Sequence, residues 1–261
     1  MAEPPPIRRG ADPWTHLRAA TPARIGLGQT GDAIPTRAVL ALKAAHARAR
    51  DAAHARLDAA ALAATLADPP AICVRSQVPD RQTYFKRPDL GRRLDPVCLP
   101  SLPKGDYDLA LIVVDGLSAT GITAHAPPLV EAILARLPRR FALPPLVVAE
   151  QGRVALGDEI SEALGAKGAV VIIGERPGLT VPDSIGVYLT YAPKRGTRDA
   201  ERNCISNIHC NGGLSYAAAA DKIVWLVAEM LRRRVSGITL KDDQPAAAVT
   251  MEANDTGRLL S

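Results

Sequence analysis

Between Asp108 and Arg234 the sequence alternates between short β-branched apolar runs and helical segments, a pattern that few folds can satisfy. Apolar runs that are almost unbroken fit strands buried on both faces of a sheet, and intervening helices allow consecutive strands to run parallel. The predicted strands are 108–114, 146–149, 168–173 and 185–191, and the predicted helices are 128–137, 158–164 and 214–234. The pattern therefore predicts an α/β fold with a doubly wound parallel sheet.

The first hundred residues have a different character. Residues 36–66 hold neither glycine nor proline and are rich in good helix formers, which predicts a long helix, broken near Asp58 and stopped by Pro69-Pro70. A polar, arginine-rich stretch at 73–93 and a proline-rich linker at 95–105 follow. We therefore expect a small helical N-terminal domain over 13–100 and an α/β domain over 101–240. The polar segments 1–12 and 241–261 are expected to be a disordered leader and tail.

Composition excludes several classes of protein. The chain has 261 residues, 47% of them hydrophobic, but its apolar runs are far shorter than the roughly 18 residues that cross a membrane. Residues 1–10 lack the apolar core of a secretory signal, and the four cysteines show no paired spacing, which favours reduced thiols in the cytoplasm. The net charge of +5 is scattered, and the 3% of aromatic residues argue against nucleic-acid binding.

The expected ligand site lies at the carboxyl ends of the strands, because loops converge there at a topological switch point. Five polar segments are candidates: 115–118, 151–154, 174–178, 192–195 and 203–209. Ordinary turn chemistry explains any one of them, including Asp115 before Gly116, although Asp115 could also be a general base or a metal ligand. Glu175 and Cys204 are less typical of simple turns.

Other motifs lack the context that their chemistry needs. Residues 26–31 read Gly-x-Gly-x-x-Gly with Asp51 downstream, but no strand precedes Gly26, so a nicotinamide site is disfavoured. Cys204, His209 and Cys210 fall short of the four ligands of a structural zinc site. No nucleophile elbow or phosphate-binding Gly-Lys-Ser/Thr loop is present. The residues alone therefore indicate a domain that presents a cofactor to chemistry performed elsewhere.

Four short motifs resemble the small (light) subunit family of ethanolamine ammonia-lyase. They are YFKRPDLGRRL at 84–94, DGLS at 115–118, GERPGL at 174–179 and CISNI at 204–208. The likeness runs in the same order and with similar spacing from about Pro13 to Leu240. The resemblance implies a Rossmann-like α/β domain behind a helical N-terminal domain.

The resemblance also implies a partner, a cofactor and a reaction. In this family a TIM-barrel large subunit holds ethanolamine, and adenosylcobalamin lies between the barrel and the small subunit. The hetero-oligomer converts ethanolamine into acetaldehyde and ammonia by radical chemistry, which is the cofactor's contribution. The implied enzyme is a carbon–nitrogen lyase whose small subunit is inactive alone. A bacterial microcompartment is a further implied location, although the leader is shorter than in relatives with a targeting extension.

Three cofactor-binding positions of the family match Val154, Glu175 and Cys204 of this chain. A valine can pack on the apolar corrin ring, a carboxylate can accept hydrogen bonds from its amides, and a thiol offers a small, soft contact. Arg153 and Arg176 could meet the phosphate of the cofactor or carboxylates of the large subunit. The resemblance assigns no catalytic residue to this chain and no role to His209 or Cys210.

Two rival functions stay open. One is a free-standing nicotinamide-dependent oxidoreductase, which would bind NADH and not cobalamin. The other is a non-catalytic assembly subunit, in which Val154→Asp would leave the cofactor affinity of the complex unchanged.

Overall fold

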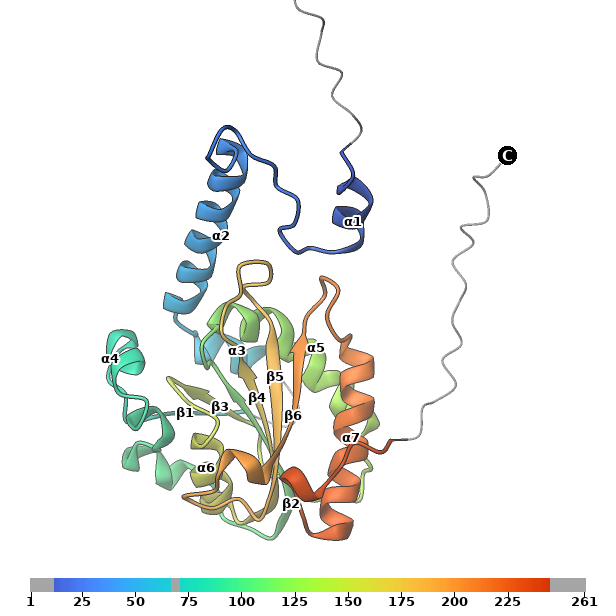
Figure 1. The fold of residues 1–261 in the computed structure, drawn as a ribbon. Helices are drawn as coiled ribbons and strands as arrows, with labels where there is room; N and C mark the ends of the chain where they lie inside the picture. Colours follow the sequence, from blue (N-terminus) through green and yellow to red (C-terminus); the bar gives the residue numbers. More distant parts are fainter. Residues whose placement is uncertain (1–11, 67–70, 245–261) are drawn as a thin grey trace, which may run out of the picture.

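The computed structural model describes residues 12–66 and 71–244. Its centre is a six-stranded sheet with the strand order β1-β3-β2-β4-β5-β6 (Figure 1). The strands are β1 (Ile72–Arg75), β2 (Tyr107–Val114), β3 (Val147–Glu150), β4 (Ala166–Gly174), β5 (Ile185–Tyr191) and β6 (Arg202–Ile208). The α-helices are α1 (Thr15–Ala20), α2 (Thr36–His54), α3 (Ala59–Thr65), α4 (Arg81–Lys86), α5 (Ala119–Arg136), α6 (Leu156–Leu164) and α7 (Tyr216–Arg233). The predicted α/β class is confirmed.

The sheet is only partly parallel. β1, β3, β2 and β4 run parallel to one another, whereas β5 is antiparallel to β4 and β6 is antiparallel to β5. The expectation of a wholly parallel sheet is therefore wrong for the last two strands. The physical reason is that neither the connection 175–184 before β5 nor the connection 192–201 before β6 contains an α-helix, and each is shorter than the dozen or so residues that a parallel crossover needs.

Two strands were not predicted. β6 occupies most of the segment 203–209, which we expected to be a loop, and its buried residues are separated by exposed polar ones. β1 lies within the expected helical N-terminal domain, yet Ile72 pairs with Val147 of β3 and adds an edge strand to the sheet. The division of the chain near residue 100 stays a prediction, and the expectations for 1–11, Pro69-Pro70 and 245–261 lie outside the described residues.

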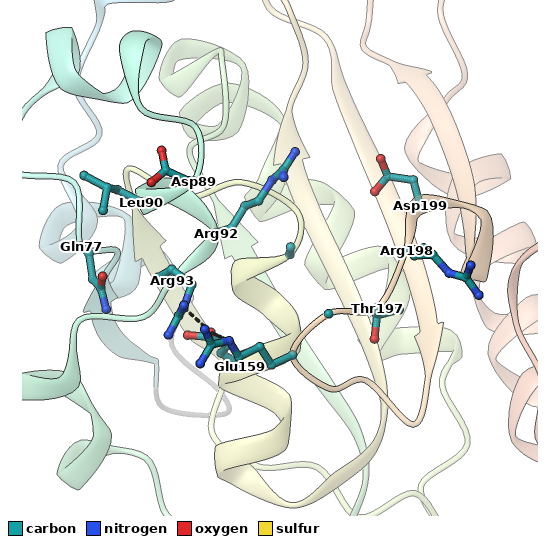
Figure 2. Close-up of a pocket in the computed structure, with 12 residues that line it drawn as sticks. Gln77, Asp89, Leu90, Arg92, Arg93, Glu159, Thr197, Arg198 and Asp199 are labelled. Carbon is teal, nitrogen blue, oxygen red and sulfur yellow. Dashed lines mark ion pairs between the residues drawn. The ribbon is translucent and has the colours of Figure 1, made fainter.

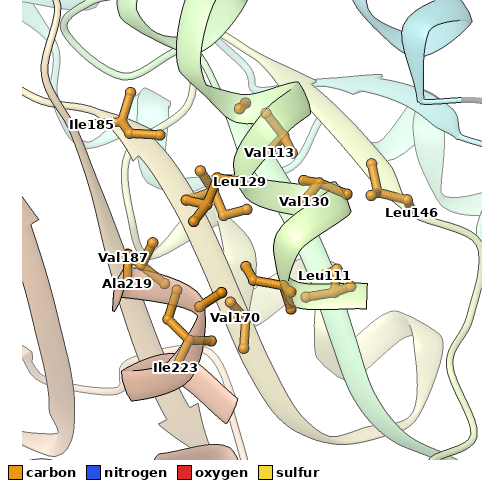
Figure 3. Packing of buried hydrophobic residues seen from close by; sticks show 14 of the residues in the cluster. Leu111, Val113, Leu129, Val130, Leu146, Val170, Ile185, Val187, Ala219 and Ile223 are labelled. Atoms are coloured by element: carbon orange, nitrogen blue, oxygen red, sulfur yellow. The ribbon is translucent and has the colours of Figure 1, made fainter. Parts of the chain in front are cut away.

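Helices cover both faces of the sheet. Side chains alternate along β2, so that Leu111 and Val113 face α3, α5 and α7, whereas Ile112 and Val114 face α6. Figure 3 shows the first of these layers, in which Leu129 of α5 packs among strand residues. Burial of both faces explains why the strands read as unbroken apolar runs.

The predicted helix break near Asp58 is confirmed. α2 ends at His54, and the carboxylate of Asp58 caps α3 by accepting a hydrogen bond from the Ala61 N–H. α5 is longer than predicted, because Ser118 caps it well before the Pro127-Pro128 pair at which we placed its start. None of the helices within residues 12–66 and 71–244 has both the length and the apolar character that a bilayer crossing requires.

Candidate functional site

The loops after three parallel strands meet at one cavity of about 580 Å³, which we call the first cavity. β2 lies between β3 and β4, and the two crossovers pass over opposite faces of the sheet, one through α5 and the other through α6. Such a switch point leaves an open crevice at the carboxyl ends of the strands. The lining residues include Gly116 and Leu117 after β2, Arg153, Val154 and Ala155 after β3, Gly174, Glu175 and Arg176 after β4, and Tyr84, Phe85 and Pro88 in and after α4.

Glycines allow two of these loops to touch. Gly116 has a φ of +57°, and a Cβ atom at Gly174 would collide with the carbonyl oxygens of Asp115 and Ser118. The Leu117 N–H donates to the Gly174 carbonyl at 2.9 Å. The loops after β2 and β4 therefore form one continuous wall.

A buried ion pair lies beneath this wall. One Asp115 carboxylate oxygen accepts a hydrogen bond from the Gly152 N–H at 3.0 Å, and the other lies 3.4 Å from Nη1 of Arg81. Arg81 Nη1 also donates to the Gly116 carbonyl, and its Nε donates to the Ala53 carbonyl at the end of α2. Asp115 therefore links the loops after β2 and β3 and does not line the first cavity. This position argues against a role as general base.

Burial raises the pKa of Asp115 to about 6, and the Arg81 guanidinium and the Gly152 N–H only partly oppose this rise. Because the folded pKa exceeds the ordinary value, the folded protein holds a proton that the unfolded chain releases between about pH 4 and pH 6. Stability from this group is present below that window and is lost as the pH rises through it. We expect the free energy of unfolding of the wild type, relative to Asp115→Asn, to fall between pH 4 and pH 7 in urea titrations. A difference that is independent of pH would contradict this expectation.

Tyr84 holds the segment 84–94 against the loop after β3. Its ring contacts the guanidinium groups of Arg81 and Arg153, whose Cζ atoms are 4.4 Å and 4.0 Å from the ring centroid. Its hydroxyl donates to the Gly152 carbonyl at 3.0 Å, and the Arg153 N–H donates to the Gly91 carbonyl at 2.7 Å. We did not predict Tyr84 and Phe85 as site residues, although an aromatic pair in a chain this poor in aromatics was a usable signal.

The structure brings Val154 and Glu175 together in the first cavity. Val154 is half-buried and its other side packs on the α6 side of the core. Both carboxylate oxygens of Glu175 lie 3.3 Å from the Asn207 N–H, which donates to them. An apolar side chain and an oriented hydrogen-bond acceptor from different loops therefore share one space.

Cys204 occupies a different position from the one expected. It lies within β6, paired with Tyr188 of β5, and does not line the first cavity, whereas Tyr188 does. The expectation that Cys204 follows a strand is wrong because the segment pairs with β5 as a strand of its own. Packing against the sheet raises the pKa of the Cys204 thiol, which is therefore neutral at pH 7.

His209 forms hydrogen bonds with Asn207 and Asn211, and the Asn207 N–H is the group that orients Glu175. Its Nδ1 accepts a hydrogen bond from the Asn211 N–H at 3.1 Å, so the proton is on Nε2, which lies 2.9 Å from the Asn207 side-chain oxygen. Both ring nitrogens of this buried histidine are therefore occupied within the protein. Cys210 is exposed, and among residues 12–66 and 71–244 no group of three or more His, Cys, Asp or Glu side chains is placed to hold a metal ion.

The last candidate segment, 192–195, and the glycine motif at 26–31 do not line the first cavity. Residues 192–195 are at the opposite edge of the sheet, because β5 is antiparallel, and the Ala192 N–H donates to the Lys167 carbonyl near the start of β4. The expectation that they follow a parallel strand is wrong. Gly26–Gly31 lies between α1 and α2, the described residues 12–25 before it hold no strand, and Asp51 lies inside α2. The glycine motif therefore lacks the strand–turn–helix context of a dinucleotide site.

A second cavity of about 660 Å³ adjoins the first and shares the lining residues Arg92, Ala155 and Asp199 with it (Figure 2). Its other lining residues include Arg93 and Glu159, which form an ion pair with a separation of 2.7 Å, and the segment Arg195–Asp199. The two cavities thus form one trough along the α6 side of the sheet.

Comparisons with known proteins agree with this architecture. The family model "Ethanolamine ammonia-lyase light chain (EutC)" matches residues 11–241. The ethanolamine ammonia-lyase small subunit of Azotobacter vinelandii is 48% identical over 258 residues, which cover 95% of each chain. The small subunit of the same name from Pseudomonas aeruginosa strain LESB58 is 46% identical over 98% of this chain and 96% of its own length. The chain therefore belongs to the ethanolamine ammonia-lyase light-chain family.

Proposed function

We propose that this chain is the small subunit of an adenosylcobalamin-dependent ethanolamine ammonia-lyase. Together with a TIM-barrel large subunit it would convert ethanolamine into acetaldehyde and ammonia, in the cytoplasm or within a bacterial microcompartment. Family membership supports the enzyme, and one observation supports the role of this chain most directly. Val154 and Glu175, which come from loops after different strands, line the same cavity at the switch point of the sheet.

The residues of the first cavity fit a corrin cofactor. Val154, Leu117 and Ile173 offer apolar surface for a broad ring, and the Glu175 carboxylate can accept hydrogen bonds from the ring's amide groups. The buried Nε of Arg153 has no hydrogen-bond partner among the described residues, so a donor is left for a ligand oxygen. A cavity of about 580 Å³ is smaller than a whole cobalamin, so a second wall is needed. A large subunit would supply it, which explains why this chain would be inactive alone.

Adenosylcobalamin supplies the radical chemistry when it is bound. Val154 packs against the ring, and Glu175, oriented by the Asn207 N–H, fixes the ring through its amides. Tyr188 lines the same cavity and separates Cys204 from it, so the contribution of Cys204 depends on its packing against Tyr188. The chain offers no substrate-handling residue in this scheme, and ethanolamine would be held by the large subunit.

Two substitutions test the site without removing the fold. Glu175→Ala should weaken binding of cyanocobalamin to the two-subunit complex about tenfold, because one hydrogen bond to a charged group is lost. Cys204→Trp should weaken it by displacing Tyr188 into the cavity. Equilibrium dialysis measures both effects, and co-purification with the large subunit checks that the complex still assembles.

Glu131→Ala is the matched control, since Glu131 is an exposed carboxylate on α5, on the other side of the sheet. We expect it to leave cyanocobalamin affinity unchanged. Wild-type affinity in both site variants would contradict the assignment of Glu175 and Cys204, and would favour a subunit that serves assembly only.

A further inference from the structure

The trough formed by the two cavities continues well beyond the surface that a corrin ring needs. The first cavity lies over Val154 and Glu175, and the second extends along α6 to Arg195. Arg92 and Ala155 stand at the seam between the cavities because they line both. A ligand that fills the first cavity with a ring can therefore reach the second with a side arm.

The arginines that line the trough are not all neutralised within the chain. Arg93 and Arg195 lie 2.7 Å and 3.8 Å from the same Glu159 carboxylate oxygen, and Arg198 lies 3.4 Å from Glu201. Arg92, Arg153 and Arg176 have no carboxylate within 4 Å among the residues that the structure describes. Six arginines line the two cavities against four carboxylates, those of Asp89, Glu159, Glu175 and Asp199. Within the described part of the chain Glu175 accepts only from the Asn207 N–H, and Asp199 is almost fully exposed and 3.7 Å from Arg202. The trough therefore carries uncompensated positive charge.

Backbone contacts at the seam bring the segments of Arg92 and Arg153 close together. The Arg153 N–H donates to the Gly91 carbonyl at 2.7 Å, which joins the loop after β3 to the residue before Arg92. A Cβ atom on Gly91 would lie 3.0 Å from Cγ of Arg153, so only glycine allows this approach without displacing the arginine. Figure 2 shows the Arg92 side chain extending into the space opposite Asp199. The amino end of α6, whose N-cap residue Ala155 has no capping side chain, opens at the same place.

We propose that the seam binds the phosphodiester of the cofactor's nucleotide arm, with Arg92 as its principal contact and Arg153 beside it. This inference rests on the proposed function, because it takes cobalamin as the ligand. The phosphodiester is an oxyanion with two free oxygens, which a guanidinium group can meet with two parallel hydrogen bonds. The second cavity then receives the ribose and base that follow the phosphate.

A pair of corrinoids tests the contact directly. Cyanocobalamin carries the nucleotide arm, and dicyanocobinamide has the same ring without the phosphodiester, ribose and base. In the complex of this chain with its large subunit, Arg92→Gln should raise the Kd for cyanocobalamin about tenfold and leave the Kd for dicyanocobinamide unchanged. The preference of the wild type for cyanocobalamin should shrink as ionic strength rises, since an exposed charge contact is screened.

Arg140→Gln is the matched control, because Arg140 is an exposed arginine outside the trough, beside Phe141. It should change neither Kd. Equal effects of Arg92→Gln on both corrinoids, or no effect on either, would overturn the proposal. Separation of the subunits in the Arg92→Gln variant would also overturn it, because the partner of Arg92 would then be a carboxylate of the large subunit. If the wild-type complex binds neither corrinoid, the proposed function itself fails, an outcome distinct from loss of the phosphate contact.

Discussion

Asp158→Ala should lower the free energy of unfolding by about 3–5 kcal/mol, because it leaves a buried guanidinium group with only the solvent-exposed Asp199 carboxylate, 3.7 Å away, as a counter-charge. Nη1 and Nη2 of Arg202 bind the two carboxylate oxygens of Asp158 at 2.6 Å and 2.7 Å, and both side chains are 1% exposed. Arg202 also donates to the Thr190 hydroxyl and the Thr197 carbonyl. The pair joins α6 to the two strands that complete the sheet, so its loss weakens the contact between them.

Urea unfolding followed by circular dichroism measures this effect. Asp158→Leu combined with Arg202→Met should recover much of the lost stability, since replacing both partners leaves no unpaired buried charge. Glu229→Ala is the control: Glu229 pairs with Arg232 and Arg233 on the surface of α7, and we expect a loss of less than about 1 kcal/mol. A loss as small as this for Asp158→Ala would show that the buried pair is not what holds α6 to β6.

Val154→Asp should weaken binding of cyanocobalamin to the two-subunit complex by about a hundredfold or more. The substitution exchanges an apolar contact with the ring for a carboxylate that must lose its water when the ring covers it. Because Val154 is only half-buried in this chain, the folded state can keep the new carboxylate in contact with water. The thermal unfolding midpoint of the chain should therefore change little, which separates an effect on binding from one on folding.

Val97→Asp provides the matched change at a position outside both cavities, since Val97 is 71% exposed. It should leave cofactor affinity as in the wild type. Unchanged affinity in Val154→Asp would mean that the first cavity does not face the cofactor, and would favour a subunit that serves assembly only.

The buried strands could be predicted because burial on both faces imposes an apolar run that the sequence displays directly. The predicted strand 185–191 coincides with β5, and 108–114 differs from β2 by one residue. Direction was harder to predict, because it depends on the connection and not on the strand. The lack of a helix in 175–184 was visible in the sequence and, given proper weight, would have identified the antiparallel turn.

Half of the site followed from the same rule. Segments 115–118, 151–154 and 174–178 converge because each follows a parallel strand, and the structure confirms this. The other half depends on contacts between distant parts of the chain. Tyr84 lies far from Gly152 in the sequence, and the Gly91 carbonyl, next to Arg92, accepts a hydrogen bond from the distant Arg153 N–H. Local patterns do not carry such pairings, so single-sequence reasoning did not place these residues in the site.

The proposed function requires this chain to be an essential part of a cobalamin-dependent lyase that performs no chemistry by itself. Ethanolamine-dependent acetaldehyde formation with adenosylcobalamin should therefore be measured for this chain alone, its large subunit alone and the two together. We expect acetaldehyde only from the mixture. Equal activity of the large subunit without this chain, or no activity in a mixture of two folded chains that bind each other, would show that this chain does not have the proposed role.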